Sequence, residues 1–358
     1  MKILYCCTSI DNCEHAYLSG LSKRGVEYYV VAPDVENFRK LKEENIVKRL
    51  TFKTRSKLSI GAIAKFYELI KSFKPDIVHC IDGKSLSCGI IALRLLKSNI
   101  PLIAYRGTMG NLSKLDVGTW LAHRNPRITK ITCVSDAVRR SLIENGLPKE
   151  KLITIHKGHS IDWYKEKYSI DKQMLGIKDN DKLISCVAND RPHKGLHILI
   201  QAFHNVKNKN SHLLLIGTIQ SKKILNLCKN GKNADRIHIL GYIPNAWMVS
   251  GATDIFVLPS TAREGLAKSV IEAMAQGVPA IVSDVGGLPE IVRNNKDGLV
   301  VKGSDIAALS AAIDKLVLND ELLKKFSKSA KQRIETSFNT LETQEKILRL
   351  YKMLSGKK

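Results

Sequence analysis

The sequence predicts an α/β protein made of two doubly wound, Rossmann-like domains that face each other across a cleft. Three observations favour this fold. Short β-prone runs alternate with longer amphipathic segments, an order typical of parallel sheets covered by helices. The alternation begins again near the middle of the chain. The length of 358 residues is large for a single hydrophobic core and sufficient for two domains.

The first half contains a series of expected strands with helical patterns between them. The β-prone runs are residues 2–8, 28–32, 76–80, 102–105, 131–134 and 152–155. The helical patterns cover residues 60–73, 86–96 and 136–145. We therefore expect βαβ units and a mainly parallel sheet in an N-terminal domain over residues 1–163.

The second half repeats this organisation. Strands are expected at residues 183–188, 212–216, 237–240, 254–258 and 280–283, and helices at 194–206, 222–229, 268–276 and 306–318. The polar stretch 162–181 is interpreted as a linker, so the second domain is placed at residues 164–339. The amphipathic segment at 340–358 is expected to form a C-terminal helix that packs back on the first domain.

Composition indicates a globular protein in a reducing compartment. Hydrophobic residues make up 44% and charged residues 25% of the chain, as in soluble proteins. No apolar run reaches the roughly 18 residues of a membrane span, and the N-terminus lacks the pattern of a signal peptide. The eight cysteines include no CxxC pair, which favours buried thiols over metal ligands or disulfides. We expect a cytoplasmic protein.

The net charge of +23 favours anionic partners, and the basic excess is spread over both halves. Nucleic acid is one candidate, but no motif interleaves aromatic and basic residues, and aromatics are only 6% of the chain. A phosphorylated or lipid-linked ligand and an anionic membrane surface are the alternatives. The first domain has dense basic stretches that include Lys53, Arg55, Lys57, Arg124, Arg127 and Lys130.

Two carboxylates follow an expected strand that ends near Pro259. Glu264 lies in the turn after this strand, and Glu272 lies about one turn inside a helix that we expect to begin near Ala267 or Lys268. The free N–H groups at a helix start suit a phosphate, and flanking carboxylates can accept hydrogen bonds from hydroxyls. Solvated surface residues are the alternative for either glutamate taken alone.

A second cluster, Asp190-Arg191-Pro-His-Lys194-Gly195, also follows an expected strand and begins a helix. Two cations at a strand end can hold a diphosphate and stabilise the charge that develops as it leaves. A third element, Gly286-Gly287-Leu-Pro289-Glu290, follows the next strand along the chain, and its glycines allow close approach of the backbone.

These three elements, in this order, resemble the GT-B glycosyltransferases, specifically the large retaining family 4 (glycosyl transferases group 1). The resemblance covers residues 183–300 most specifically; Pro75-Asp76-Ile-Val-His79 and Val134-Ser135 match the first domain more loosely. It implies an acceptor-side domain followed by a nucleotide-sugar donor domain. It also implies catalytic roles for Arg191, Lys194 and Glu264. The implied donor-binding residues are Gly265, Leu266, Ala267, Lys268, Ser269, Glu272, Tyr242 and Ile243.

The resemblance also locates the acceptor side, where this chain departs from the family pattern. The first loop lacks the usual glycine pair, and Arg106-Gly107 stands where many members have His-Gly. Asp11, Asn12, Arg106 and Gly107 are the candidate acceptor-side residues. The implied reaction transfers a sugar from a UDP-, GDP- or ADP-sugar, with retention, to a glycolipid, lipopolysaccharide or other polysaccharide-precursor acceptor.

The resemblance implies no cofactor and no essential metal. Asp179-Asn-Asp181 has the form of a DxD metal motif, but its polar setting favours a plain turn. A sugar-nucleotide epimerase of GT-B fold and a non-catalytic nucleotide-sugar-binding subunit are the alternative functions. We expect the protein in the cytoplasm, at the inner membrane face if its acceptor is lipid-linked.

Overall fold

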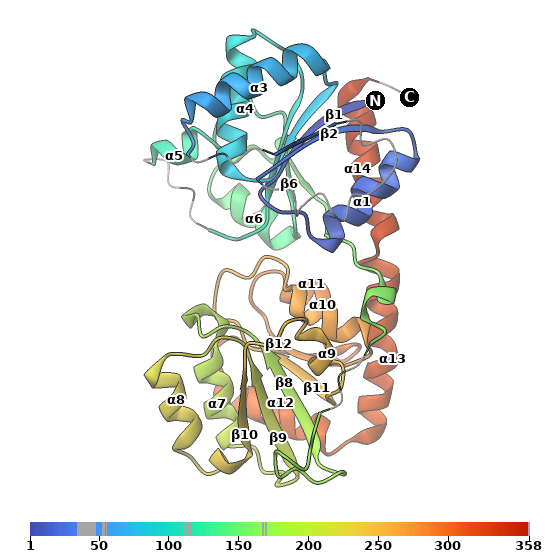
Figure 1. The fold of residues 1–358 in the computed structure, drawn as a ribbon. Helices are drawn as coiled ribbons and strands as arrows, with labels where there is room; N and C mark the ends of the chain where they lie inside the picture. The colour runs from blue at the N-terminus through green and yellow to red at the C-terminus, as the bar shows by residue number, and fades with distance from the viewer. Residues whose placement is uncertain are drawn as a thin grey trace. The chain divides into compact units, whose positions relative to one another are not determined.

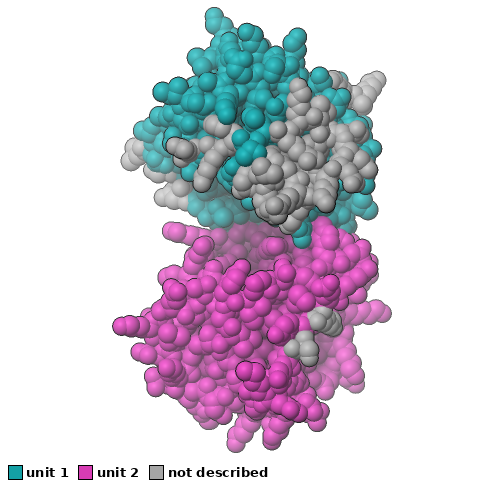
Figure 2. Space-filling view, viewed as in Figure 1, with its two compact units in different colours: residues 1–158, 339–358 teal, residues 159–338 magenta. Residues whose placement is uncertain are grey.

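The computed structural model describes residues 1–33, 48–51, 54, 56–110, 112, 116–166, 168 and 170–356. The chain forms two compact units, residues 1–158 with 339–358 and residues 159–338 (Figure 2). The expected boundary at 163 lies five residues beyond the observed one, because 159–163 belongs to the second unit. Next to these residues, Tyr164 is buried, and the centre of its ring lies 5.3 Å from that of Trp247 in the second unit. Residues 162–181 therefore lie within the second unit, and the expectation that they link the two units is wrong.

The first unit is a parallel sheet covered by helices (Figure 1). Its strands lie in the order β3-β2-β1-β4-β5-β6-β7, and all of the pairings are parallel. The elements are β1 (Lys2–Cys6), α1 (Asn12–Lys23), β2 (Glu27–Ala32), β3 (Lys48–Thr51), α3 (Ile60–Phe73), β4 (Ile77–Cys80), α4 (Gly83–Leu95), β5 (Leu102–Arg106), α5 (Val117–Trp120), β6 (Lys130–Cys133), α6 (Asp136–Glu144), the 3-10 turn η1 (Lys149–Lys151) and β7 (Leu152–Thr154).

The C-terminal helix α14 (Thr340–Ser355) belongs to the first unit and lies beside α1 (Figure 1). Its apolar face joins the core of this unit, where Tyr351 is fully buried. The Tyr351 hydroxyl forms a 2.8 Å hydrogen bond with Nδ1 of His79 on β4. Gln344 Nε2 donates to the carbonyl oxygen of Ala16 on α1 at 3.2 Å. These polar contacts fix the register of the returning helix against the sheet.

The second unit is also a parallel sheet between helices (Figure 1). Its strands lie in the order β10-β9-β8-β11-β12-β13. The elements are η2 (Ile161–Tyr164), β8 (Lys182–Val187), η3 (Pro192–Lys194), α7 (Leu196–His204), β9 (Ser211–Ile216), α8 (Lys222–Lys229), η4 (Ala234–Arg236), β10 (Ile237–Gly241), α9 (Trp247–Ser250), β11 (Ile255–Leu258), α10 (Lys268–Ala275), β12 (Ala280–Ser283), α11 (Leu288–Ile291), β13 (Gly298–Val301), α12 (Ile306–Val317) and α13 (Asp320–Ser337).

The two-domain, Rossmann-like fold predicted from the sequence is confirmed, and the sequence analysis missed several elements. Strands β3 and β13 and helices α1 and α13 were not expected. The expected helix at 194–206 is shorter, because η3 and the left-handed Gly195 precede α7. Lys53 and Arg55 lie outside the described residues.

The order of the strands positions the loops that matter for function. In each sheet, successive strands are added first on one side and then on the other side of the first strand. The order reverses between β1 and β4 in the first unit and between β8 and β11 in the second. Ligands of open α/β sheets bind at such a point, beside the carboxyl ends of the strands.

The state of the cysteines and the apolarity of the helices bear on two expectations from the sequence. All eight cysteines are free and buried, so the expectation of buried thiols is confirmed. In the part of the chain that the structure describes, no helix combines the length and apolarity that a membrane span requires.

Candidate active site

The loop after β8 is attached to the loop after β11, across the point where the strand order reverses. Gly195 has a φ of 72°, and a Cβ atom there would lie 2.0 Å from the carbonyl oxygen of Pro259. The backbone N–H of Thr261 donates to the carbonyl oxygen of His193 at 2.8 Å. Because only glycine fits such an approach, the turn carrying Lys194 lies directly against the end of β11.

The side chain of Glu264 contacts residues of both loops. It is buried, and its Oε2 accepts hydrogen bonds from Lys194 Nζ and from Ser260 Oγ, each at 2.8 Å. Ser283 at the end of β12 donates to the carbonyl oxygen of Ser260 at 2.5 Å. The carboxylate is therefore held in one orientation, with Lys194 as its counter-ion.

The third motif contacts the same residue through its backbone. The N–H of Gly287 donates to the carbonyl oxygen of Glu264 at 3.1 Å. A Cβ atom on Gly286, which has a φ of 60°, would lie 2.0 Å from that oxygen. The loops after β8, β11 and β12 thus meet at Glu264. Gly286 makes a contact with Glu264 that a residue with a side chain could not make.

Glu272 lies inside α10, which begins at Lys268 as the sequence predicts. Its side chain is mostly buried, and this burial raises its pKa, while Lys268 Nζ at 3.3 Å opposes the rise. The N-cap of α10 is Ala267, whose methyl side chain cannot accept a hydrogen bond from the first turn. The backbone N–H groups at this end of the helix can therefore receive an anion.

The remaining donor-side residues surround this centre. Arg191 is exposed and immediately precedes η3, and Gly265 is buried between Glu264 and the start of α10. Tyr242, which is 73% exposed, and Ile243 follow β10, next to the point where the N–H of Gly217 donates to the carbonyl oxygen of Gly241. Leu266 and Ser269 are half-buried on either side of Ala267.

A partly buried charge cluster lies at the carboxyl end of β1 in the first unit. Asp11 is the N-cap of α1 and forms a capping box with Glu14, in which each carboxylate accepts a backbone N–H of the other residue. Lys157, just after β7, donates to Asp11 Oδ2 at 2.8 Å and to Glu14 Oε1 at 2.7 Å. Its ammonium also lies 5.6 Å from the centre of the Tyr105 ring, a cation–π contact.

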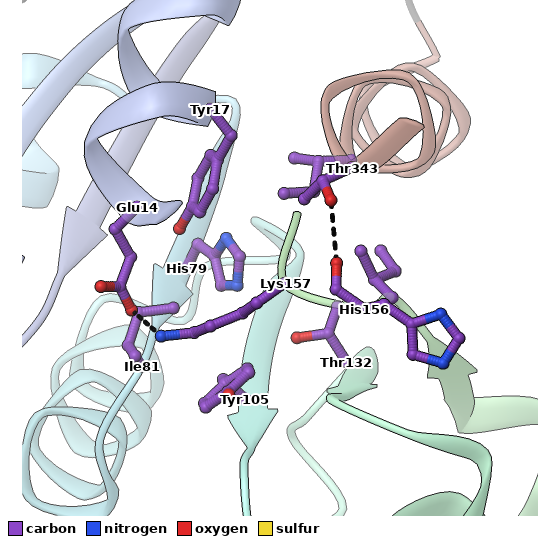
Figure 3. Close-up of a pocket in the computed structure, with 11 residues that line it drawn as sticks. Glu14, Tyr17, His79, Ile81, Tyr105, Thr132, His156, Lys157 and Thr343 are labelled. Carbon is purple, nitrogen blue, oxygen red and sulfur yellow. Dashed lines mark hydrogen bonds and ion pairs between the residues drawn. The ribbon is translucent and has the colours of Figure 1, made fainter. Parts of the chain in front are cut away.

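This cluster borders a cavity of about 30 Å³ that Tyr17, His79, Thr132 and Thr343 also line (Figure 3). Burial raises the pKa of Glu14 to about 7; the neighbouring Asp11 carboxylate adds to the rise, and Lys157 opposes it. The pKa of Lys157 is raised by the carboxylates and Tyr105 despite its burial. Burial lowers the pKa of His79 to about 3, so its ring is neutral at physiological pH.

Of the other acceptor-side candidates, Asn12 opens α1 and is exposed. Arg106 is the last residue of β5, and its Nε donates to the carbonyl oxygen of Thr108 at 3.0 Å. Gly107 follows it, and a Cβ atom there would lie 2.9 Å from the Tyr105 hydroxyl. These residues therefore belong to the same strand-end region as Asp11, Glu14 and Lys157.

Comparison with known proteins identifies the family. Residues 168–333 match the family model described as glycosyl transferases group 1, and residues 15–163 match the model of glycosyltransferase family 4. The chain is a group 1 glycosyltransferase of GT-B fold.

Relatives of this glycosyltransferase agree with that assignment. It is 28% identical to the UDP-Gal:alpha-D-GlcNAc-diphosphoundecaprenol alpha-1,3-galactosyltransferase of Escherichia coli, over 81% of this chain and 78% of the relative. It is 25% identical to the capsular polysaccharide biosynthesis glycosyltransferase CapM of Staphylococcus aureus, over 92% and 91%. The crystal structure of HepE from Anabaena in complex with UDP has the same fold, with a TM-score of 0.81 at 20% identity over 99% of this chain and 100% of HepE.

The structure of the glycosyltransferase brings together Lys194, Glu264 and Gly286-Gly287, which the sequence analysis selected as separate motifs. Lys268, which the sequence analysis expected beside a phosphate, forms an ion pair with Glu272. Glu14, Lys157 and Ser260 were missed. The Asp11–Glu14 spacing is the signature of a capping box and could have predicted that pair. Nothing local to Lys157 predicts its partners, because Glu14 lies 143 residues away.

Proposed function

We propose that the enzyme transfers a sugar, with retention of anomeric configuration, from a UDP-sugar to a lipid-linked polysaccharide precursor. The observation that carries this proposal is the convergence of Lys194, Glu264 and the Gly286 turn beside the uncapped start of α10. The names of the E. coli galactosyltransferase and of the UDP complex of HepE support UDP among the UDP, GDP and ADP donors considered. Neither family model favours an epimerase.

In this proposal the diphosphate lies at the N-terminus of α10, where the N–H groups of residues 266–269 face it. Lys194 and Arg191 neutralise the charge that develops on the leaving diphosphate. Lys194 has three N–H donors, and Glu264 uses one of them, so the ammonium can hold the diphosphate without leaving its partner. Glu264 binds hydroxyls of the transferred sugar, and Glu272 binds the ribose.

The acceptor lies beside Asp11, Asn12, Arg106 and Gly107 in the first unit. We propose that the leaving diphosphate takes the proton of the acceptor hydroxyl as the new glycosidic bond forms on the same face of the sugar. No metal or cofactor is assigned to this reaction. The buried free thiols support a cytoplasmic location, and a lipid-linked acceptor would bring the enzyme to the inner membrane face.

A panel of UDP-, GDP- and ADP-sugars tests the proposal. The purified enzyme should hydrolyse or transfer from a UDP-sugar in buffer containing EDTA, and NMR of the product should show the anomeric configuration of the donor. An inverted product would refute retention, and complete loss of activity in EDTA would refute metal independence. Turnover of GDP- or ADP-sugars alone would overturn the choice of UDP.

A further inference from the structure

The loop between β11 and α10 contains an arginine whose backbone is held in the left-handed region (Figure 1). Arg263 has a φ of 59° and directly precedes Glu264, the residue at which three loops meet. This conformation costs energy for a residue with a Cβ atom, and glycine adopts it without that cost. Such residues gather at functional sites, where the side chain itself is needed. The position favours glycine, so an arginine here indicates a use for its side chain.

Packing within the second unit does not supply this use. Arg263 is exposed and is not part of the hydrophobic core of the unit. Among the residues that the structure describes, no carboxylate lies within ion-pair distance of its guanidinium. The cation is therefore available to a ligand.

The loop after β8 brings a second arginine to the same place. The backbone N–H of Thr261, two residues before Arg263, donates to the carbonyl oxygen of His193 at 2.8 Å. Burial lowers the pKa of the His193 ring, and the ammonium of Lys194 lowers it further. The guanidinium groups of Arg191 and Arg263 act on this pKa in the same direction, so both lie near the ring.

The charges in this region leave these two arginines uncompensated. The two lysines of the region are each paired with a glutamate and so add little net charge: Lys194 with Glu264 at 2.8 Å, and Lys268 with Glu272 at 3.3 Å. Arg191 and Arg263 have no such partner in the part of the chain that the structure describes. The diphosphate of a nucleotide sugar carries one negative charge on each phosphate. Two unpaired guanidinium groups match that charge, and Arg191 alone would leave half of it unmatched.

We propose that Arg263 binds the diphosphate of the donor, together with Arg191, and stabilises it as the leaving group. Its planar guanidinium can donate two parallel N–H groups to phosphate oxygens. Ala267, the N-cap of α10, lies four residues further along the same loop, so the guanidinium and the free N–H groups of the helix start can bind one anion. Negative charge grows on the diphosphate as the sugar departs, and this strengthens the contact in the transition state. The inference rests on the proposed function, because it assumes a nucleotide-sugar donor.

Two substitutions at Arg263 separate its charge from its backbone. Arg263→Gly removes the cation and relieves the left-handed conformation, whereas Arg263→Gln removes the cation and keeps that conformation. Both should raise the dissociation constant of UDP by about 10–100-fold, as expected for the loss of a hydrogen bond between charged groups. Both should also lower kcat with a UDP-sugar, by about 100-fold. Calorimetry and steady-state kinetics measure these changes.

Stability gives a readout that a structural role would move in the other direction. Arg263→Gly should not lower the melting temperature, because glycine adopts this conformation without strain. A loss of UDP binding in a protein that is as stable as the wild type is therefore a loss of the ligand contact. Full UDP binding and full kcat in both variants would overturn the proposal.

The matched control is Lys74→Gly in the first unit. Lys74 is also an exposed cation in the left-handed region, with a φ of 50° at the C-cap of α3. Its replacement removes the same charge and relieves the same kind of backbone conformation, and should leave UDP binding and kcat unchanged. Equal weakening by Lys74→Gly would show that net charge is responsible, and would refute a specific contact of Arg263.

The choice of ligand distinguishes the phosphates from the rest of the donor. Uridine lacks the diphosphate, so Arg263→Gly should leave its inhibition constant unchanged, and equal weakening of UDP and uridine would contradict the proposal. A variant that binds UDP normally and needs only more of a lipid-linked acceptor would assign Arg263 to an acceptor phosphate instead. If the wild type binds GDP or ADP and not UDP, the choice of UDP fails, and the same comparison with that nucleotide tests Arg263.

Discussion

Lys194 Nζ lies 2.8 Å from Glu264 Oε2, although 70 residues separate the two in the chain. The side chain of Glu264 is 8% exposed and that of Lys194 is 24% exposed, so water screens this pair only partly. The pair joins the two loops that border the strand-order reversal in the second unit. The pair therefore connects the two loops, and in the proposed mechanism Lys194 also neutralises the donor diphosphate.

Replacing Lys194 should reduce turnover. Lys194→Met removes the cation that stabilises the leaving diphosphate in the proposed mechanism, and the loss of one such donor lowers kcat by about 10²–10³-fold. Steady-state kinetics with the preferred UDP-sugar measures this. Lys207→Met, at an exposed lysine of the same unit, is the control and should leave kcat unchanged. Equal kcat in the Lys194→Met enzyme and the wild type would remove Lys194 from the proposed mechanism.

The same pair should show energetic coupling. Lys194→Met and Glu264→Gln each break the ion pair, so the double variant should be less destabilised than the two losses combined. We expect a coupling of about 0.5–3 kcal/mol in the free energy of unfolding. Urea denaturation of the four proteins in the cycle gives this value. Additive losses would mean that the contact contributes nothing to stability.

Replacing Glu272 should weaken donor binding more than catalysis. Glu272→Ala removes the carboxylate that, in the proposed function, accepts hydrogen bonds from the ribose, and a hydrogen bond to a charged group is worth about 1.5–3 kcal/mol. The dissociation constant of UDP should therefore rise by about 10–100-fold, as measured by calorimetry. Glu321→Ala at the exposed start of α13 is the control. A fall in kcat without weaker UDP binding would contradict the ribose role.

Gly286 should tolerate no side chain. In Gly286→Ala the new Cβ would lie 2.0 Å from the carbonyl oxygen of Glu264, at a φ of 60°. Gly176→Ala is a matched control, because Gly176 has a φ of 68° and its Cβ would meet nothing within 4 Å. The control should lose about 1–2 kcal/mol of stability, which is the cost of a left-handed backbone conformation for alanine. Gly286→Ala should lose more stability than the control. Equal melting temperatures for the two variants would show that the loop moves aside freely.

Glu14 should make stability depend on pH. Its pKa rises in the folded state from 4.5 to about 7, so the folded protein binds a proton that the unfolded chain releases in this range. Stability from this group is present below about pH 4.5 and is lost as pH rises to about 7, by about 3 kcal/mol. Glu14→Gln should remove this slope.

Burial lowers the pKa of His79, so this group makes the folded protein less stable as pH falls below 6.5. Because this effect is opposite to that of Glu14, the test uses the difference in stability between wild type and Glu14→Gln at each pH. That difference isolates Glu14 because both proteins retain His79. Urea titrations from pH 4.5 to 7.5 measure it. A difference that does not change with pH would show that Lys157 keeps Glu14 ionised throughout.

Much of the fold was predictable because its signals are local. Buried parallel strands are short apolar runs, and this pattern located most of the strands, including Ala280–Ser283 with its observed bounds. The four-residue β3 contains Lys48 and Arg49 and gives no such signal. Helix α13 was missed although Leu323, Phe326, Ala330 and Ile334 recur at helical spacing, because most of its other residues are polar.

The sequence by itself determined the fold class, the family and the three motifs of the proposed donor site, since each depends on residues that are neighbours in the chain. Only the tertiary structure decided which of these residues meet. Lys194 reaches Glu264, Lys157 reaches Glu14, and Tyr351 reaches His79 across 70, 143 and 272 residues. In a parallel sheet the carboxyl ends of strands that are distant in sequence lie side by side, and strand order follows from burial of the whole core. No local pattern encodes that order.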